Sequence, residues 1–248
     1  MKNRFTSLIA ATGAVSILAG CAPINKPEPW NYDPFLASSP KTLLVVMPTS
    51  EASNVKAPAA CLAGSVIPLS EAGYYPLPVA MVNDTFRLNG VNDAAEIRQI
   101  PREKLKEVFG ADAALLITVL KYETKYVLLD SVTNVHVGAQ LVDLNNGAIL
   151  WENRFAVSNA NTGSGSLLAK LVGAVVKHVV NETTDQGYSL ARLNAAYLYT
   201  PGAIRPTPIL AGPYHRYYHN DPILQKIKVE CGAEEDQVKE NGQAFKKN

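Results

Sequence analysis

Histidines are the side chains of this chain best suited to catalysis or metal binding, and only two of the four lie close together. His215 and His219 are four residues apart, a spacing that two metal ligands on one helix could use. Prolines flank this stretch, no glutamate completes an H-E-x-x-H motif, and no third ligand is evident. We therefore interpret the pair as part of a surface patch and predict no metal site.

Other catalytic motifs are incomplete. A glycine-serine segment that opens a helix can bind phosphate, but the segment 161–166 has Ser166 where the Walker motif needs a lysine. A flexible loop that ends in a serine N-cap is the simpler interpretation. The sequence contains no G-x-G-x-x-G and no G-x-S-x-G motif. We find no nucleophile with a base and an orienting group, so the sequence predicts a non-enzyme without a cofactor.

The N-terminus carries chemistry of another kind. Lys2 and Arg4 precede a short apolar run, and Leu18-Ala19-Gly20-Cys21 follows it directly. A positive start, a short apolar core and small residues before a cleavage site are typical of an export signal. The four residues that end in Cys21 resemble the lipobox of bacterial lipoproteins, in which the cysteine receives a diacylglycerol. We expect residues 1–20 to be the signal peptide and Cys21 to carry the membrane anchor. A plain signal peptide with a chance cysteine is the alternative.

The residues after the lipobox indicate the destination membrane and a tether. Ala22, rather than aspartate, follows the cysteine, and the sorting rule of enteric lipoproteins then favours the outer membrane. Residues 23–40 contain five prolines, so we expect residues 21–40 to form an extended tether. Trp30 and Tyr32 could instead lie at the lipid headgroups.

The remaining cysteines form an even pair. With Cys21 used by the lipid, Cys61 and Cys231 are left. Such a pair can persist as a disulfide outside the cytoplasm, and this bridge would tie the C-terminal tail to an early loop. Two unpaired thiols are the alternative, because a sequence does not give the Cβ geometry.

Composition indicates an ordinary globular chain. Its 248 residues are 47% hydrophobic, with 23 basic and 22 acidic side chains, and this near-neutral balance argues against a nucleic-acid partner. We expect an α/β domain over residues 41–200, followed by a Pro/Tyr-rich arm and a polar, partly disordered tail over residues 201–248. The arm contains a polar-aromatic patch of candidate interaction residues: Tyr214, His215, Tyr217, Tyr218 and His219.

An antiparallel meander is expected to form the centre of the domain, between residues 111 and 157. Residues 113–120 are almost wholly apolar, as in a buried strand, and Asn145-Asn146-Gly147 predicts a chain reversal. The second strand alternates between an apolar face of Thr133, Val135, Val137, Ala139 and Leu141 and a face of Asn134, His136, Gly138 and Gln140. The third strand places Ile149, Trp151, Phe155 and Val157 on one face and Glu152 and Arg154 on the other.

The other expected elements surround this meander. Residues 43–47 predict a buried strand, residues 49–68 a long loop with one helical turn, and residues 74–79 an edge strand with prolines. Short helices are expected over residues 80–88, 93–97 and 101–109. A longer helix over residues 167–180 is too short and too charged to span a membrane. Helix over residues 181–199 should bury Leu190, Leu193, Ala196 and Tyr197. This order predicts an α/β fold, a mixed sheet with helices packed on it.

Several short sequence segments, in a fixed order, resemble those of one bacterial lipoprotein family. They are the lipobox, Gly73-Tyr74-Tyr75-Pro76-Leu77-Pro78-Val79, Phe109-Gly110-Ala111-Asp112-Ala113, Leu141-Val142-Asp143-Leu144 with Gly147, Leu150-Trp151-Glu152, and Gly212-Pro213-Tyr214-His215. The family has no known function and includes a meningococcal surface-antigen candidate. The likeness covers residues 41–215. It implies a sandwich similar to the amino-terminal domain of TolB and to the lipoprotein activators of peptidoglycan synthases.

The resemblance also implies a role. It indicates kinship with accessory lipoproteins encoded beside a homologue of the curli secretion channel, and members of such folds bind other envelope proteins. We expect an outer-membrane lipoprotein, in the periplasm or at the surface, that serves an envelope secretion or assembly complex without catalysis. The alternative is a small-ligand or glycan-binding lipoprotein that uses the patch at residues 214–219. Exposed sheet edges could also pair copies into a homo-oligomer.

Overall fold

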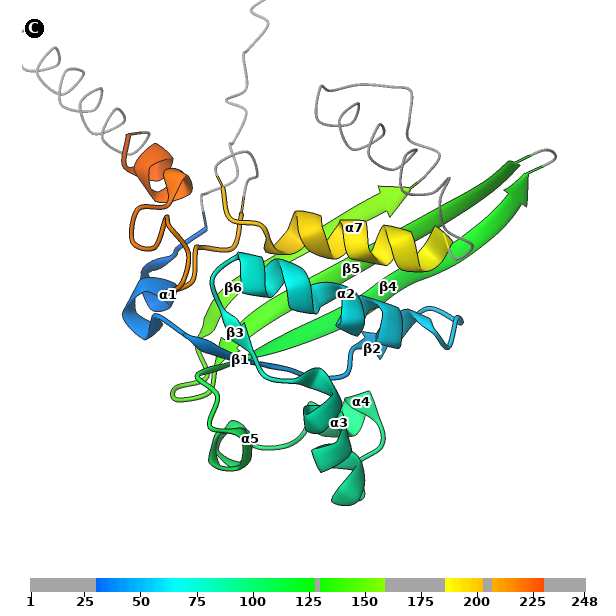
Figure 1. Cartoon of the computed structure of the whole chain (residues 1–248), viewed down its shortest axis with the longest axis horizontal. Helices are drawn as coiled ribbons and strands as arrows, with labels where there is room; N and C mark the ends of the chain where they lie inside the picture. The colour runs from blue at the N-terminus through cyan, green and yellow to red at the C-terminus, as the bar shows by residue number, and fades with distance from the viewer. Residues whose placement is uncertain (1–29, 128–129, 159–185, 203–206, 230–248) are drawn as a thin grey trace, which may run out of the picture.

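The structure, a computed structural model, describes residues 30–127, 130–158, 186–202 and 207–229. Within them a six-stranded sheet has the order β3-β1-β4-β5-β6, with β2 beside β4 (Figure 1). The strands are β1 (Thr42–Val45), β2 (Thr49–Ser50), β3 (Tyr75–Pro76), β4 (Ala113–Val127), β5 (Asp130–Asp143) and β6 (Ile149–Ser158). The helices are α1 (Asp33–Ser38), α2 (Ala57–Glu71), α3 (Val79–Leu88), α4 (Ala94–Ile97), α5 (Arg102–Phe109) and α7 (Gln186–Tyr199).

The sheet is mixed, as predicted. β1 pairs in parallel with β3 and β4, whereas β4, β5 and β6 are successive antiparallel neighbours. The predicted α/β class with an antiparallel meander is therefore confirmed. β3 lies at the edge of the sheet, where its proline costs no ladder hydrogen bond. β4 and β5 are longer than predicted, and in Figure 1 their far ends extend past α7.

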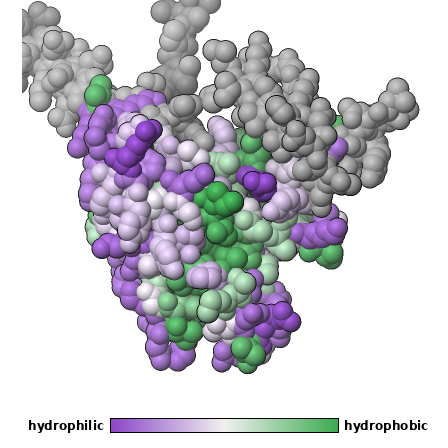
Figure 2. All heavy atoms as spheres, in the orientation of Figure 1, coloured by the Kyte–Doolittle hydropathy of each residue, from purple (hydrophilic) through white to green (hydrophobic). Residues whose placement is uncertain are grey.

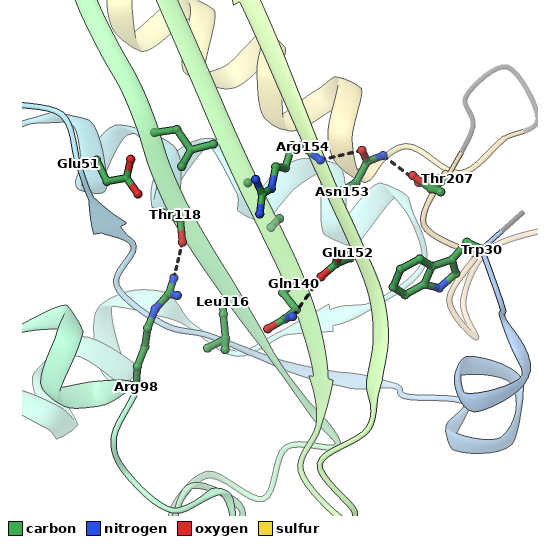
Figure 3. Close-up of a pocket in the computed structure, with 13 residues that line it drawn as sticks. Trp30, Glu51, Arg98, Leu116, Thr118, Gln140, Glu152, Asn153, Arg154 and Thr207 are labelled. Carbon is green, nitrogen blue, oxygen red and sulfur yellow. Dashed lines mark hydrogen bonds between the residues drawn. The ribbon is translucent and has the colours of Figure 1, made fainter. Parts of the chain in front are cut away.

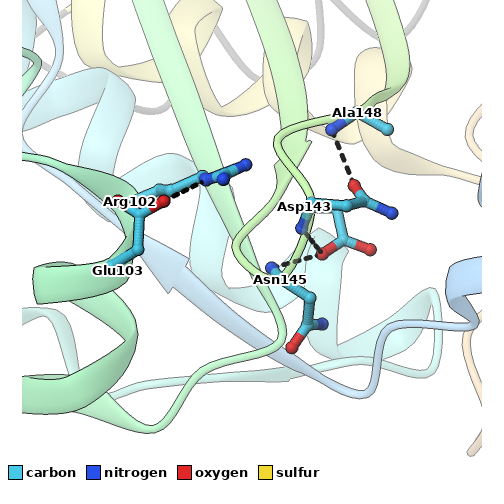
Figure 4. Close-up of polar contacts among 6 residues, drawn as sticks. Arg102, Glu103, Asp143, Asn145 and Ala148 are labelled. Atoms are coloured by element: carbon cyan, nitrogen blue, oxygen red, sulfur yellow. Dashed lines mark hydrogen bonds and ion pairs between the residues drawn. The ribbon is translucent and has the colours of Figure 1, made fainter.

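The turn between β5 and β6 is built around Asp143 (Figure 4). Its carboxylate accepts the backbone N–H groups of Asn145 and Asn146, and its own N–H donates to the Ala148 carbonyl at 2.9 Å. Gly147 has φ +78°, a value that glycine adopts without strain. The predicted chain reversal at this point is confirmed.

One residue of the predicted inner face of β6 points outward. Ile149 is 45% exposed, because the register shifts beside it: Leu141 lies opposite Trp151, but Val142 lies opposite Ile149. Leu150 is the extra residue of this bulge, and both Leu150 and Trp151 are fully buried. The prediction for Ile149 was wrong, because a period of two does not reveal a bulge.

α2 replaces most of the loop predicted over residues 49–68. Small residues fill it, and Pro58 lies in its first turn, where a missing N–H costs nothing. Pro68 lies inside the helix and was wrongly interpreted as part of a loop. At Gly64, a Cβ atom would lie 3.3 Å from the Arg192 Cα of α7, so the two helices pack backbone against backbone. Figure 2, a view from this helical side, shows an apolar strip across the region of α2 and α3.

The helices divide between the two faces of the sheet. α2 and α7 pack together over β4, β5 and β6 and enclose the main core. α3, α4 and α5 cover the other face beside β1 and the start of β4, around a second cluster. That cluster consists of Leu44, Val46, Val82, Phe86, Ile97, Leu105, Ala111, Ala114 and Leu144. The second face is thus covered at one end only by the described helices.

α7 is rotated relative to the prediction. Leu190 is buried as expected, but Ala196 is exposed and Leu193 and Tyr197 are only half-buried. α7 contacts both α2 and the sheet, so its buried face is broader than a single stripe. The buried residues of α7 are Gly187, Ser189, Leu190, Ala191, Asn194, Ala195, Leu198 and Tyr199. The helix predicted over residues 167–180 lies outside the described residues.

The folded domain reaches beyond residues 41–200 on both sides. α1 lies within the segment assigned to the tether, with Phe35 buried. The hydroxyl of Tyr32, also buried, donates to the Pro208 carbonyl at 2.6 Å. In the arm, Leu210 and Ile223 belong to the same core as Tyr32. Residues 30–40 and 207–229 are therefore part of the domain, while residues 21–29 and 230–248 lie outside the described part.

The arm is fixed to the start of β3 through main-chain contacts. Gly212 N–H donates to the Ala72 carbonyl at 2.8 Å, and Tyr214 N–H donates to the Gly73 carbonyl at 3.0 Å. The Tyr74 hydroxyl donates to the Leu210 carbonyl at 2.6 Å. Two of the sequence segments that carry the family resemblance, one around Gly73 and one around Gly212, are thus in contact in the folded chain.

Asp221 stabilises this arm at an electrostatic cost. It is 2% exposed, its carboxylate accepts the Ala211 N–H at 2.8 Å, and a helical segment, residues 222–229, begins directly after it. Burial raises the pKa of Asp221, although the nearby His215 and His219 act in the opposite direction. Because the folded pKa is raised, protonation favours the folded state. This contribution is complete below the ordinary aspartate pKa, about 3.9, and is lost as the pH rises through the raised value.

Asp221→Asn should therefore be more stable than the wild type at pH 7, since an amide keeps the acceptor and removes the buried charge. The difference should vanish near pH 3.5. Asp221→Ala, which leaves the Ala211 N–H without its acceptor, should cost about 1–3 kcal/mol. Urea unfolding of the three proteins at both pH values measures these effects. An asparagine variant that is less stable at pH 7 would show that the charge favours the folded state.

Candidate functional site

A hollow of about 620 Å³ lies on the uncovered end of the second sheet face (Figure 3). Its floor is formed by two rows of side chains that cross β4, β5 and β6. The first row is Leu116, Gln140 and Glu152, and the second is Thr118, Gly138 and Arg154. Because alternate residues of a strand share a face, these six point to the same side, away from α2 and α7. We call these six residues the open face.

Arg98 borders the open face in a fixed position. It directly follows α4, and its Nη2 donates to the Ile117 carbonyl at 2.6 Å and to the Thr118 hydroxyl at 2.9 Å (Figure 3). Burial lowers the pKa of the guanidinium, which nevertheless stays protonated in water. The bonds to β4 hold the cation at the edge of the hollow.

Arg154 crosses the open face from β6 toward β4. Its Cγ would lie 3.5 Å from a Cβ atom at Gly138, so the side chain lies over the strand position that has no side chain of its own. In the neighbouring row, Gln140 Nε2 donates to the Glu152 carboxylate at 3.2 Å, so this anion already has a hydrogen-bond donor on the open face. Among the described residues, no ion pair joins Arg98 or Arg154 to a carboxylate.

Positive charge continues beyond the hollow. Past a bulge in β4, Lys121 lies opposite His136 in the next row. Burial lowers the pKa of His136, and the charges of Arg154 and Lys121 lower it further. Burial first, and the neighbouring cations second, thus favour the neutral form of the His136 imidazole.

The side chains around this hollow are suited to hydrogen bonding and stacking. Trp30 lies at the far end of the hollow, where its Nε1 donates to the Leu150 carbonyl at 3.3 Å. Arginine, glutamine and tryptophan side chains supply directed donors and a flat apolar surface. In the described part of the chain, no cluster of three or more His, Cys, Asp or Glu side chains could hold a metal ion.

The predicted patch at residues 214–219 forms a separate loop. Tyr214 is 74% exposed, the rings of His215 and Tyr217 lie 5.3 Å apart, and those of Tyr218 and His219 lie 3.8 Å apart. The structure thus brings the five residues into one loop, but none of them lines the hollow. The cavity beside this loop measures only about 10 Å³, enough for one water molecule.

Two of the three cysteines, Cys21 and Cys231, lie outside the described residues. Cys61 lies on the inner side of α2 and is 3% exposed, and burial raises the pKa of its thiol to about 12. The lipid on Cys21 and the bridge from Cys61 to Cys231 stay predictions.

The predicted bridge has a direct test. The mature protein is unfolded without reductant, treated with iodoacetamide and weighed by mass spectrometry. If Cys61 and Cys231 are bridged, neither thiol reacts until a reductant is added. Two alkylated cysteines before reduction would contradict the bridge. The same treatment of the folded, reduced protein should modify Cys61 very slowly, because thiolate is the reactive form.

The described helices do not include one that is long and apolar enough to cross a membrane.

Comparison with known proteins gives the relatives of this chain. A family model described as "Putative lipoprotein GNA1162-like" matches residues 30–214. "Putative lipoprotein NMB1124/NMB1162" of Neisseria meningitidis serogroup B (strain ATCC BAA-335 / MC58) is 41% identical over 216 residues, which are 87% of this chain and 98% of the relative.

Solved structures of other proteins resemble this chain too. The crystal structure of lipoprotein GNA1162 from Neisseria meningitidis is 44% identical, covers 58% of this chain and 100% of its own, and superposes with a TM-score of 0.48. A PelC dodecamer from Paraburkholderia phytofirmans is 16% identical, covers 62% of this chain and 89% of its own, and has a TM-score of 0.37. The family match and the sequence identity to the Neisseria relative confirm the resemblance read from the sequence, and the chain belongs to the GNA1162-like lipoprotein family.

Proposed function

We propose that this lipoprotein is a non-catalytic accessory component of an envelope secretion or assembly complex and that it binds its partner protein through the open face. The supporting observation is that helices cover one side of β4, β5 and β6, while the described residues leave the other side hollow. A sheet face with polar and charged side chains, next to packed helices, is suited to a protein interface. A curli-channel-like secretion component is the kind of partner that the family resemblance suggests.

The anchor in this proposal is the lipid on Cys21. Ala22 directs the protein to the outer membrane, with the domain in the periplasm or at the surface. Cys21→Ser should move the protein from the membrane fraction to the soluble fraction of lysed cells, since acyl chains supply the lasting attachment. A Cys21→Ser protein that stays with the outer membrane would contradict this anchor.

Photo-crosslinking in intact cells tests the binding face. A photoreactive amino acid in place of Gln140 should capture an envelope protein, whereas the same group in place of Arg192, exposed on α7, should not. Gly138→Leu is a variant designed to block partner binding sterically. A leucine at this position fills the hollow, and the backbone conformation there is one that any residue can adopt. We expect Gly138→Leu to leave the melting temperature nearly unchanged and to remove the crosslink. Equal capture from both positions would contradict the open face as the interface.

A second candidate function is small-ligand or glycan binding, and one observation favours the open face for it. The volume of about 620 Å³ falls within the range of about 300–1,000 Å³ that small-molecule pockets occupy. Trp30 at its border could stack on a sugar ring. The exposed patch at residues 214–219 was the predicted location, but its cavity of about 10 Å³ is too small for a sugar. Binding of cell-wall sugar fragments that Trp30→Ala abolishes would support this second function.

A further inference from the structure

We propose that the partner presents an acidic, extended segment to the open face and that Arg98 and Arg154 bind its carboxylate. This inference rests on the proposed function and specifies the chemistry of the partner. The two arginines come from different parts of the chain, the end of α4 and the middle of β6, and both border the same hollow.

Arg98 is oriented before any partner arrives. One terminal nitrogen is used by the Ile117 carbonyl at 2.6 Å and the Thr118 hydroxyl at 2.9 Å. A guanidinium has five N–H donors, so the rest of the group remains available to a carboxylate. Because these bonds already fix the side chain, a ligand would order less of it on binding.

Arg154 supplies the second cation. The side chain lies over Gly138, with its Cγ 3.5 Å from the position of a Cβ atom there, and reaches toward Thr118 (Figure 3). Thr118, Gly138 and Arg154 form one row across the three strands. Both guanidinium groups therefore lie along this row, and a carboxylate above Thr118 could contact the two together.

The placement of charge indicates an acidic occupant. Lys121, beyond the hollow, is paired with Glu123 at 4.0 Å, so the two arginines are the cations that line the hollow, and neither has an ion pair among the described residues. Of the two carboxylates that line the hollow, Glu152 accepts from Gln140 at 3.2 Å and Glu51 lies at the border. A partner with aspartate or glutamate at the centre would complement the arginines, whereas a basic partner would be repelled.

The shape indicates a protein segment. The floor of the hollow is formed by three neighbouring strands. Of the described residues that line it, Trp30, Glu51, Arg98 and Thr207 come from other segments and form its border. A shallow surface of this kind accepts an extended chain that runs across neighbouring strands, which lie about 4.8 Å apart. An aromatic or apolar residue farther along the segment, at the far end of the hollow, would contact Trp30.

Charge reversal in cells tests the proposal. With the photoreactive group at position 140, Arg154→Glu should lower capture of the partner about tenfold or more, because a charge-assisted hydrogen bond is replaced by repulsion. Arg98→Glu should act in the same direction, and its melting temperature is measured because Arg98 also contacts β4. The matched control is Arg87→Glu, an exposed arginine of α3, which should capture as much partner as the wild type.

Two further results complete the test. Mass spectrometry of the crosslinked peptide should show aspartate or glutamate near the attachment point, and changing that residue to arginine in the partner should restore capture by Arg154→Glu. If capture at position 140 is unaffected by both reversals, the acidic inference is wrong while the proposed binding function stands. If the folded wild type captures nothing at position 140, the proposed function at this face is wrong as well.

Discussion

Gly73→Ala is expected to lower the free energy of unfolding by about 3–5 kcal/mol, or the melting temperature by about 10 °C. Gly73 has φ +87°, where any side chain is strained by about 1–2 kcal/mol. A Cβ atom at this position would lie 2.6 Å from the His215 Cβ and 2.9 Å from the Gly212 carbonyl oxygen. Both neighbours belong to the arm, so the arm must move or the backbone must change.

Gly90→Ala is the matched control for this prediction. Gly90 has a similar φ of +81°, but nothing lies within 4 Å of a Cβ atom there. The control thus carries the backbone strain alone and should cost about 1–2 kcal/mol. Thermal unfolding followed by circular dichroism gives both values. If the two variants melt at the same temperature, the close contact of Gly73 with the arm does not contribute to stability.

The contact between Gly73 and the arm also relates two sequence segments that are far apart in the chain. Gly212 meets Gly73 from the other side, where its Cβ atom would lie 2.6 Å from the Gly73 backbone carbon. Neither glycine leaves room for a side chain on its partner. A single sequence shows two glycines 139 positions apart, and their mutual contact follows only from the folded chain.

The meander could be predicted because its side chains alternate over many residues. Val135, Val137 and Leu141 are apolar and buried, and the residues between them form the opposite face. α2 was missed because its prolines and serines are typical of loops, although its alanines favour a helix. Gly64 permits close packing of this helix against α7. That packing is a tertiary contact, which a period in the sequence does not reveal.

Only the strand residues of the candidate site could be predicted from the sequence. Alternation places Gly138, Gln140 and Arg154 on the outer face of their strands, and the structure confirms this placement. Nothing in the sequence relates Arg98 or Trp30 to that face, because Arg98 lies between α4 and α5, Trp30 precedes α1, and both are far from β5 and β6 in the sequence. The cluster of aromatic residues at 214–219 is conspicuous in the sequence, yet the structure places it outside the hollow.

Trp151→Ala should have an effect as large as that of Gly73→Ala, about 3–5 kcal/mol. Trp151 is fully buried, and its ring centre lies 6.1 Å from that of Tyr199 on α7. Its Nε1 donates to the Thr207 carbonyl at 2.9 Å, which fixes the start of the arm beside β6. Alanine therefore removes core volume and one of the contacts that hold the border of the open face.

Trp151→Phe separates these two losses. Phenylalanine keeps most of the ring, and the Thr207 carbonyl still accepts from Asn153 Nδ2 at 2.8 Å, so no buried acceptor loses its last partner. We expect this variant to cost only about 1–2 kcal/mol. Urea unfolding is followed by circular dichroism, because both changes remove one of the two tryptophans. If phenylalanine costs as much as alanine, the hydrogen bond rather than the buried volume holds the arm in place, and binding at the open face should then weaken in both variants.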